Sequence, residues 1–474
     1  MLAEIFRQIG SSAVQSWWYI LEAFVAMVIC QDAFFACSMY WRRPRQIPIH
    51  GPSLVFGKWW SSLWFILKAP QLIVEGYKQS QSNLFAIPAR EGYLVMVTSE
   101  DQIREVENSS PDQLSFHQAM EDRLKVKYIF AGFEMGAIDP HDAVPIRVLK
   151  TLLRANIPEL RSRIQEAIEG TFETSANQDF FQATRKYHRQ ALVAMLSSHY
   201  LPHWTDKIVV PGILALGRAM KTLTSYLTLE VEQRLHYMIE GKKDVPRDAI
   251  TWVIEASTTK DQRAVKRIVQ QKDSTNMQLP KLLMFSIYRL CEHPEYTKLL
   301  LNETEAMLKL PTKDHYKHLP LMESFLREAA RHDPLDSLSV QRKVLKDFKF
   351  SDGSHVPAGN VICVPQQAVM RDPKYYDRPD DFLPSRFVSE HGDGQDDGAI
   401  QKFTDLKPHF YLWGAAAKPC PGRWYASAVM QQFFVHLLTR YNFKLADPNA
   451  SLTLTYTTIV FPRPGLKILL QERQ

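Results

Sequence analysis

Cysteine is scarce in this chain of 474 residues, and no two of its five cysteines form a Cys-x-x-Cys pair. A structural zinc site and a ferredoxin-type iron–sulfur cluster are therefore not expected. The cysteines are also too few and too scattered for a disulfide framework, which indicates a reducing compartment for most of the chain. They are Cys30, Cys37, Cys291, Cys363 and Cys420.

The chain also lacks an internal repeat, a strong charge excess and a glycine motif for dinucleotide or flavin binding. Its 57 basic and 51 acidic residues give a net charge of +6 that is spread along the chain, so nucleic-acid binding is not indicated. With 45% hydrophobic and 23% charged residues, the composition is ordinary for a globular protein and excludes a disordered or collagen-like chain. The length allows either several domains of about 150 residues or one large single-core enzyme.

Only one long apolar stretch is present, at residues 17–40, which excludes a polytopic membrane protein. Its 24 residues are about the length that spans a bilayer, although Glu22, Gln31 and Asp32 make it an imperfect span. We interpret it as a membrane anchor, and an amphipathic helix lying in the membrane interface is the alternative.

Three arginines between residues 42 and 45 follow this stretch and place the next domain on the cytoplasmic side of the membrane. Three prolines between residues 44 and 52 then predict a stiff, non-helical linker. We therefore divide the chain into an anchor at 1–41, a basic, proline-rich hinge at 42–55 and a catalytic domain at 56–474.

The body of the chain is predicted to be mainly α with a minor β part. Apolar residues recur at helical spacing from about 150 to 330. Strand signals are short and lie near 93–99, 355–366 and 452–461. Residues 372–408 have no periodicity, and irregular stretches of this length tend to be functional or disordered.

Cys420 has neighbours that suit a reactive or metal-bound sulfur. It follows a loop of small residues at 414–417 and Lys418, and Gly422 opens a long, largely apolar helix. Free N–H groups and the positive end of the helix dipole stabilise a thiolate there. From this loop alone, a buried structural cysteine, a nucleophilic cysteine and a metal thiolate all remain open.

The loop resembles the haem-ligand loop of the cytochromes P-450, which has the pattern Phe-x-x-Gly-x-Arg/His-x-Cys-x-Gly. Trp413 stands for the phenylalanine, Ala416 for the first glycine and Lys418 for the basic residue. Cys420 and Gly422 match the pattern outright, so two positions match and three are relaxed. The resemblance makes Trp413 and Gly422 part of the cofactor-binding loop.

Two further segments strengthen the resemblance. Glu328 and Arg331 have the spacing of the family's Glu-x-x-Arg signature, and residues at i and i+3 share one helix face. Arg386 ends a Phe-Leu-Pro-Ser-Arg segment that matches the family's Phe-x-Pro-x-Arg. The order also fits, with 58 residues from Glu328 to Arg386 and 34 more to Cys420, so the resemblance covers essentially the whole chain.

The resemblance implies a role for each matched residue. Cys420 would be the proximal thiolate on the iron of haem b, donating electron density that favours O–O cleavage. Lys418 and Arg342 would be partners of the haem propionates, and Arg147 or Lys150 would supply another such contact.

Glu328, Arg331 and Arg386 would lock their helix to the irregular stretch behind the cysteine loop. In the same helix, Glu323 and Arg327 are four residues apart, and we interpret them as an ion pair on the surface.

The distal side departs from the family pattern. Most members place an acid and a threonine over the haem, and the threonine helps to deliver protons to dioxygen. Counting back from His293, the equivalent stretch is 274–279, where Met277 replaces the acid and Gln278 the threonine. A register shifted by one turn would instead supply the hydroxyl of Thr275, so Gln278 and Thr275 are the catalytic candidates. An amide is a poor acid or base near neutral pH, which disfavours simple replacement of the relay without forbidding oxygenation through water or a substrate hydroxyl.

The resemblance therefore implies a membrane-tethered haem-thiolate monooxygenase, similar to the fungal cytochromes P-450 of secondary metabolism. Its catalytic domain would face the cytoplasm from the endoplasmic reticulum membrane, and NADPH would supply electrons through a separate flavin reductase. The expected substrate is an apolar small molecule, terpenoid or polycyclic. Pocket candidates are Thr275, Gln278, the 335–340 segment and the strand turn at 457–459.

Two alternatives stay open. One is a haem-thiolate enzyme that catalyses a rearrangement, cyclisation or dehydration without external electrons. The other is a non-catalytic protein that binds haem or a ligand.

Overall fold

The computed structural model describes most of the chain in two compact units. It covers residues 36–51, 57–81, 83–89, 92–129, 149–172, 178–200, 205–216, 218–242, 245–256, 278–311, 315–388 and 401–473, with scattered positions between 18 and 34. Unit 1 comprises residues 1–115, 341–365 and 456–458, and unit 2 comprises residues 116–340, 366–455 and 459–474.

Unit 1 is built on a five-stranded sheet with the strand order β1-β2-β7-β4-β3. The bounds are β1 Phe85–Ala89, β2 Gly92–Met96, β3 Leu114–Ser115, β4 Ser339–Val344 and β7 Val361–Val364. β1 and β2 form an antiparallel hairpin, β2 runs parallel to β7, and β3 is antiparallel to β4. The strand predicted near 93–99 is β2, and the strand signal at 355–366 contains both β6 and β7.

The remaining elements of unit 1 are two helices and a short ribbon. They are α2 (Gly57–Gln79), α3 (Glu100–Asn108), β5 (Phe348–Lys349) and β6 (His355–Val356). α3 begins after Ser99, whose hydroxyl accepts a hydrogen bond from the N–H of Gln102 at 3.2 Å and so caps the helix.

The described part of the predicted hinge, residues 42–51, contains no helix but is not a free connector. The N–H of Arg45 donates to the carbonyl of His355 at 3.2 Å, and the N–H of His50 donates to the carbonyl of Ala86 at 2.8 Å. Residues 45–50 are thereby attached to the strands of unit 1. Eleven of the 24 residues of the predicted anchor at 17–40 lie outside the described residues, and among those described no helix is long and apolar enough to cross a membrane.

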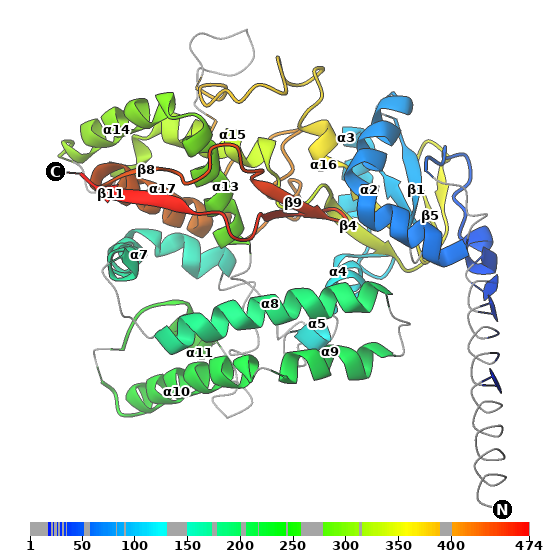
Figure 1. Cartoon of the computed structure of the whole chain (residues 1–474), viewed down its shortest axis with the longest axis horizontal. Coiled ribbons are helices and arrows are strands. Elements are labelled where there is room, and N and C mark those ends of the chain that lie inside the picture. The colour runs from blue at the N-terminus through cyan, green and yellow to red at the C-terminus, as the bar shows by residue number, and fades with distance from the viewer. Residues whose placement is uncertain are drawn as a thin grey trace, which may run out of the picture. The chain divides into compact units, whose positions relative to one another are not determined.

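Unit 2 is mostly helical (Figure 1). Its helices are α4 (Phe116–Leu124), α5 (Val126–Ile129), the π-helix η2 (Leu149–Leu153), α7 (Ile157–Phe172), α8 (Gln178–Tyr200), α9 (Asp206–Ala215), α10 (Ala219–Ile239), α11 (Ala249–Ala256), α13 (Leu279–Glu292), α14 (Glu295–Leu308), the 3₁₀ turn η4 (His315–Lys317), α15 (Pro320–His332), α16 (Gln366–Val369) and α17 (Arg423–Arg440). α8 packs against α9 and α10, while α17 packs against α7 and α14. This confirms the prediction of a mainly helical fold with some strands.

The strands of unit 2 form two antiparallel pairs near the C-terminus. They are β8 (Tyr441–Leu445) with β11 (Ile468–Glu472), and β9 (Thr453–Tyr456) with β10 (Ile459–Pro462). The strand predicted at 452–461 is thus a hairpin. The described parts of the predicted irregular stretch, 372–388 and 401–408, contain turns but no helix or strand.

The main core of unit 2 surrounds α15 and α17. α15 has a proline in its first turn, where no N–H is needed, and all of its residues from Ser324 to His332 are buried. Its Phe325 meets Phe434 of α17 edge-on, with ring centroids 5.6 Å apart. The segments on either side of Cys420 join the same core through Phe403, Phe410 and other apolar side chains. The irregular stretch, which connects α15 to α17 in the sequence, is therefore packed into the core around these two helices.

Candidate functional site

Cys420 lies three residues before the first residue of α17. Gly422 caps the helix and Arg423 begins it, as the sequence predicts. The N–H of Cys420 donates to the carbonyl of Trp413 at 2.7 Å, which closes the small-residue loop. That closure needs a left-handed residue at Gly414, whose φ is +82°. The backbone of the loop therefore fixes the position from which the Cys420 side chain extends.

The surroundings of the Cys420 thiol suit a thiolate held by a metal cation. Although Cys420 is exposed, the surrounding protein still removes water from its thiol, and this desolvation is the largest influence and raises the pKa of the thiol. The N–H groups of Gly422 and Arg423, together with the charge of Arg423, act in the opposite direction. The donors for an anionic sulfur are thus in place, and a bound iron would supply the remaining positive charge.

The loop around this sulfur also has room for a flat cofactor. Ala416, Ala417, Lys418 and Cys420 are all exposed, so small side chains and one thiol form an accessible surface. Gly422 adjoins the sulfur, and a Cβ there would be in ordinary van der Waals contact with it at 4.0 Å. These residues fit the haem that the resemblance implies, with Cys420 as its single protein ligand.

The expected propionate partners are spread over the chain. Lys418 belongs to the exposed loop of unit 2, whereas Arg342 lies on β4 in unit 1 and is only 4% exposed. Burial lowers the pKa of Arg342, and the charge of Glu107 partly offsets this. Arg147 and the side chain of Lys150 lie outside the described residues.

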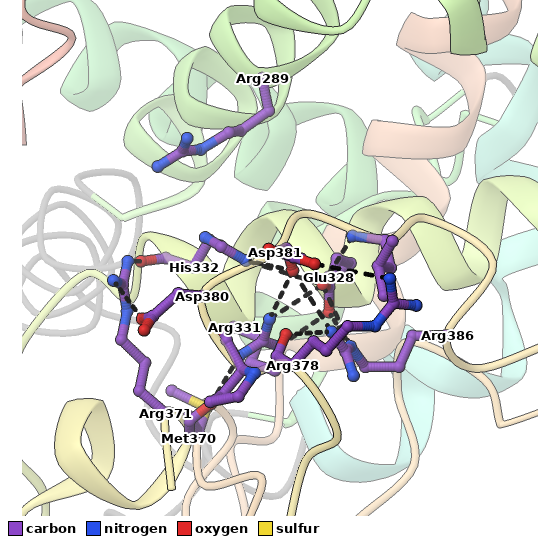
Figure 2. Close-up of polar contacts among 12 residues, drawn as sticks. Arg289, Glu328, Arg331, His332, Met370, Arg371, Arg378, Asp380, Asp381 and Arg386 are labelled. Carbon is purple, nitrogen blue, oxygen red and sulfur yellow. Dashed lines mark hydrogen bonds and ion pairs between the residues drawn. The ribbon is translucent and has the colours of Figure 1, made fainter. Parts of the chain in front are cut away.

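The structure brings Glu328, Arg331 and Arg386 together (Figure 2). Nε and Nη2 of Arg331 donate to the two oxygens of Glu328 at 2.8 and 2.9 Å. Nε of Arg386 lies 3.2 Å from both of these oxygens, and the N–H of Leu383 donates to one of them at 3.0 Å. The carboxylate is fully buried and is satisfied by charged and neutral donors together.

The two arginines also attach this carboxylate to the irregular stretch. Arg331 donates to the carbonyls of Met370 and Pro379, each at 2.7 Å, and Arg386 donates to the carbonyl of Arg378 at 3.0 Å. Breaking a buried ion pair by removing one partner typically costs about 3–5 kcal/mol. The network therefore holds α15 to the chain that leads to Cys420.

The prediction that Glu323 and Arg327 form an ion pair on the surface is wrong. Arg327 is 1% exposed and donates to the carbonyls of Lys402 and Asp405 at 2.8 and 3.2 Å. Its guanidinium lies 4.0 Å from the centroid of the Phe410 ring. Burial lowers its pKa to about 10. The helix face that the spacing suggested as solvated is covered by the irregular stretch.

Glu323 begins a chain of hydrogen bonds that sequence reasoning missed. Its Oε2 accepts from the N–H of Phe403 at 2.6 Å. The carbonyl of Phe403 accepts from the indole Nε1 of Trp413 at 2.7 Å, and the carbonyl of Trp413 accepts from the N–H of Cys420 at 2.7 Å. Burial raises the pKa of Glu323, and the N–H of Phe403 partly offsets this. Trp413 thus supplies a donor that the phenylalanine of the family pattern lacks, and this is the one signal in the sequence that pointed to the chain of bonds.

The predicted distal and pocket residues are only partly described. Gln278 is exposed and precedes α13, and its side chain makes no capping hydrogen bond. Thr275 and Met277 lie outside the described residues. The 335–340 segment meets β10, since the N–H of Val460 donates to the carbonyl of Leu335 at 3.1 Å and Asp336 forms a β-bridge with Ile459.

Comparison with known proteins agrees with this geometry. The family model described as cytochrome P-450 matches residues 281–470, which include the Glu328 network and the Cys420 loop. Cytochrome P-450 monooxygenase 151 of Postia placenta is 23% identical over 91% of this chain and 94% of its own length. Cytochrome P-450 monooxygenase ptmQ of Penicillium ochrochloron is 24% identical over 92% of this chain and 93% of its own.

A solved structure supports the fold. The crystal structure of the cytochrome P-450DA haem domain has a TM-score of 0.63 and 15% identity, covering 90% of this chain and 98% of that chain. The fold is that of the cytochromes P-450, and the geometry around Cys420 suits a haem-thiolate enzyme. The family model, the fungal relatives and the solved structure together support a fungal-type cytochrome P-450 monooxygenase, a family whose cofactor is a haem iron held by a cysteine thiolate.

Proposed function

We propose that this cytochrome P-450 is membrane-tethered and oxidises an apolar small molecule, terpenoid or polycyclic, with dioxygen and NADPH-derived electrons. The observation that carries the proposal is the accessible thiol of Cys420 on a loop of small residues, with the N–H groups of Gly422 and Arg423 directed to the sulfur. Cys420 is thereby assigned as the iron ligand.

The residues around Cys420 stabilise the sulfur and hold its loop in place. Gly422 and Arg423 stabilise the negative sulfur, and the carbonyl of Trp413 holds the backbone of Cys420. The Glu328 network fixes α15 against the stretch that precedes the loop. When bound, the haem supplies the dioxygen-activating chemistry of the family.

The tether and the substrate class rest on the sequence. The apolar stretch at 17–40 and the arginines that follow it support an anchor in the endoplasmic reticulum membrane with a cytoplasmic catalytic domain. An apolar substrate agrees with a membrane-bound enzyme. Several similar proteins come from fungi, including a cytochrome P-450 monooxygenase of Penicillium crustosum, penQ, which is 23% identical over 97% of this chain and 98% of its own length. A separate reductase is proposed as the electron donor.

The first test is the ferrous–CO difference spectrum of the full-length protein, wild type and Cys420→Ser. We expect the absorption band that gives the family its name in the wild type and its loss in the variant. Cys363 is buried in unit 1, and Cys363→Ser is the matched control that should keep the band. An unchanged spectrum for Cys420→Ser would show that another residue binds the iron.

The second test is turnover with and without NADPH and reductase. Product that forms only when NADPH and reductase are both present supports a monooxygenase, despite the residues at 277 and 278. Product formed without either would favour a rearrangement, cyclisation or dehydration, because Met277 and Gln278 stand where the family carries its acid and threonine. A protein with the expected band that forms no product in either condition would be a binding protein.

A further inference from the structure

Within unit 2, three charged side chains gather where α4, α13 and the 335–340 segment approach β10. Nη2 of Arg123, on α4, forms an ion pair with Oδ2 of Asp336 at 2.6 Å. The two side chains are 17% and 21% exposed, so the pair is largely removed from solvent. Lys281, in the first turn of α13, is the third member. The charges of Asp336 and Arg123 both act on its ammonium group.

Lys281 is the unbalanced member of this cluster. In the part of the chain that the structure describes, its Nζ donates no hydrogen bond and joins no ion pair, and it lies 4.2 Å from the centroid of the Phe461 ring. Burial lowers the pKa of Lys281 to about 8, while Asp336 raises it and Arg123 lowers it. Among the described residues, Asp336 is the one carboxylate that acts on Lys281, and it is already paired with Arg123. A cation in such surroundings costs free energy until an anion accompanies it.

The surroundings of the ammonium group are otherwise apolar. Phe461 packs against a hydrophobic cluster that also contains Ile459, Tyr187 and Leu214. Several segments that the sequence indicates as pocket walls converge here. Gln278 stands three residues before Lys281, and Asp336 forms a β-bridge with Ile459. An apolar wall with one unmatched cation is the arrangement that recognises an amphipathic anion.

We propose that Lys281 binds a carboxylate of the substrate, so that the enzyme acts on an apolar carboxylic acid. The inference rests on the proposed function, since it names the substrate class of that enzyme. The carboxylate would give the ammonium group of Lys281 an anionic partner of its own. The hydrocarbon body of the acid would lie against the apolar residues around Phe461. Charge-assisted N–H···O bonds of this kind are roughly twice as strong as neutral ones.

The test compares acids with their methyl esters, which share the hydrocarbon body and lack the charge. Binding of abietic acid and methyl abietate, and of oleic acid and methyl oleate, is measured calorimetrically on the haem-loaded full-length protein at pH 7. We expect the acid of at least one pair to bind about tenfold to a hundredfold more tightly than its ester. Two different hydrocarbon skeletons are used because the Lys281 cluster specifies the charge of the substrate and not the shape of its hydrocarbon part.

Three variants assign that preference to Lys281. Lys281→Met keeps the length of the side chain and removes the charge, so the acid should lose its advantage over the ester. Lys281→Arg keeps the positive charge, and the acid should retain most of its advantage over the ester. Lys298, exposed on α14, gives the matched control, and Lys298→Met should leave the preference unchanged.

The pH dependence provides a second readout. The charged groups that face Lys281 are Asp336 and Arg123. Affinity for the acid should therefore fall as the pH rises above about 8, where Lys281 loses its proton. Affinity for the ester should stay constant across the same range.

The outcomes separate this inference from the proposed function. Equal binding of acid and ester, or a preference that survives in Lys281→Met, would overturn carboxylate recognition. Failure of all four compounds to bind a wild-type protein with an intact CO band would overturn it too. Absence of the CO band from the wild type would instead remove the proposed function on which the inference rests.

Discussion

The Glu328 network and the Lys281 cluster both place charge inside unit 2, but they differ in how that charge is matched. Glu328 accepts from Arg331, Arg386 and a backbone N–H, and both arginines also donate to carbonyls. Lys281 has an aromatic ring and a carboxylate that is already engaged. The first arrangement is complete within the chain, whereas the second is completed by an added anion.

This difference separates a structural role from a binding role. A satisfied buried network stabilises the fold that contains it, and removing one member leaves the others unpaired. An unmatched buried cation lowers the stability of the empty protein and raises its affinity for an anion. Substitutions at the two sites should therefore change the free energy of unfolding in opposite directions.

The largest effect is expected at Glu328. Glu328→Gln removes the negative charge that Arg331 and Arg386 share, and leaves two buried guanidinium groups without it. We expect a loss of about 3–5 kcal/mol in the free energy of unfolding, measured by urea denaturation at pH 7.

The control for this substitution is Glu295→Gln on α14. The Glu295 side chain is 61% exposed and faces His293 at 3.2 Å, so its loss should change the free energy of unfolding by less than about 0.5 kcal/mol. Equal effects at Glu328 and Glu295 would show that the buried network is not what stabilises α15.

A smaller loss is expected at Trp413. Trp413→Phe restores the residue of the family pattern but removes the indole N–H, so the carbonyl of Phe403 loses its donor. An unsatisfied buried polar group costs about 1–3 kcal/mol. We expect a loss of this size and a weaker ferrous–CO band, because the loop that positions Cys420 is less firmly held.

Trp41 is 74% exposed, and Trp41→Phe is the matched control that should alter neither property. A Trp413→Phe protein with wild-type stability and an unchanged band would show that the bonds from Glu323 to Cys420 do not position the loop.

The smallest effect, and one of opposite sign, is expected at Lys281. Its pKa is lowered from 10.5 to about 8 by burial, so the unfolded chain binds this proton more tightly than the folded protein. The penalty is complete below about pH 8 and disappears as the pH rises toward 10.5. Lys281→Met should therefore be more stable than wild type by about 1–2 kcal/mol at pH 7, after allowance for partial solvent screening.

Urea denaturation of both proteins at pH 7, 8, 9 and 10 measures this difference. The advantage of Lys281→Met should shrink steadily above about pH 8, because the wild-type lysine becomes neutral. A variant that is less stable than wild type at pH 7 would mean that Lys281 is matched within the chain, and the contrast with Glu328 would not hold.

Much of the fold and of the proximal site was predictable because local patterns encode it. Helical periodicity predicted the mainly α body, and the small-residue loop before an apolar helix predicted where Cys420 lies. The spacing of Glu328 and Arg331 predicted a shared helix face, which is a property of any helix. These features depend on residues close together in the chain or on a family pattern.

The burial of a charged side chain was not predictable in the same way. Glu323 and Arg327 have the spacing of a solvated pair, yet the partner of Glu323 is Phe403, 80 residues later. The pair formed by Arg123 and Asp336 likewise joins distant segments. No short pattern tells whether a helix face meets solvent or another part of the chain.

The sequence by itself determined the resemblance to the cytochromes P-450, the place of Cys420 before an apolar helix and the residues of the Glu328 network, because each depends on spacing and residue type. Only the tertiary structure decided which charges are matched. It covered Arg327 with the irregular stretch, linked Glu323 to the Cys420 loop through Trp413, and left Lys281 beside a carboxylate already paired with Arg123. The physical reason is that the free energy of a buried charge depends on all the groups around it, and those groups come together only when distant segments pack.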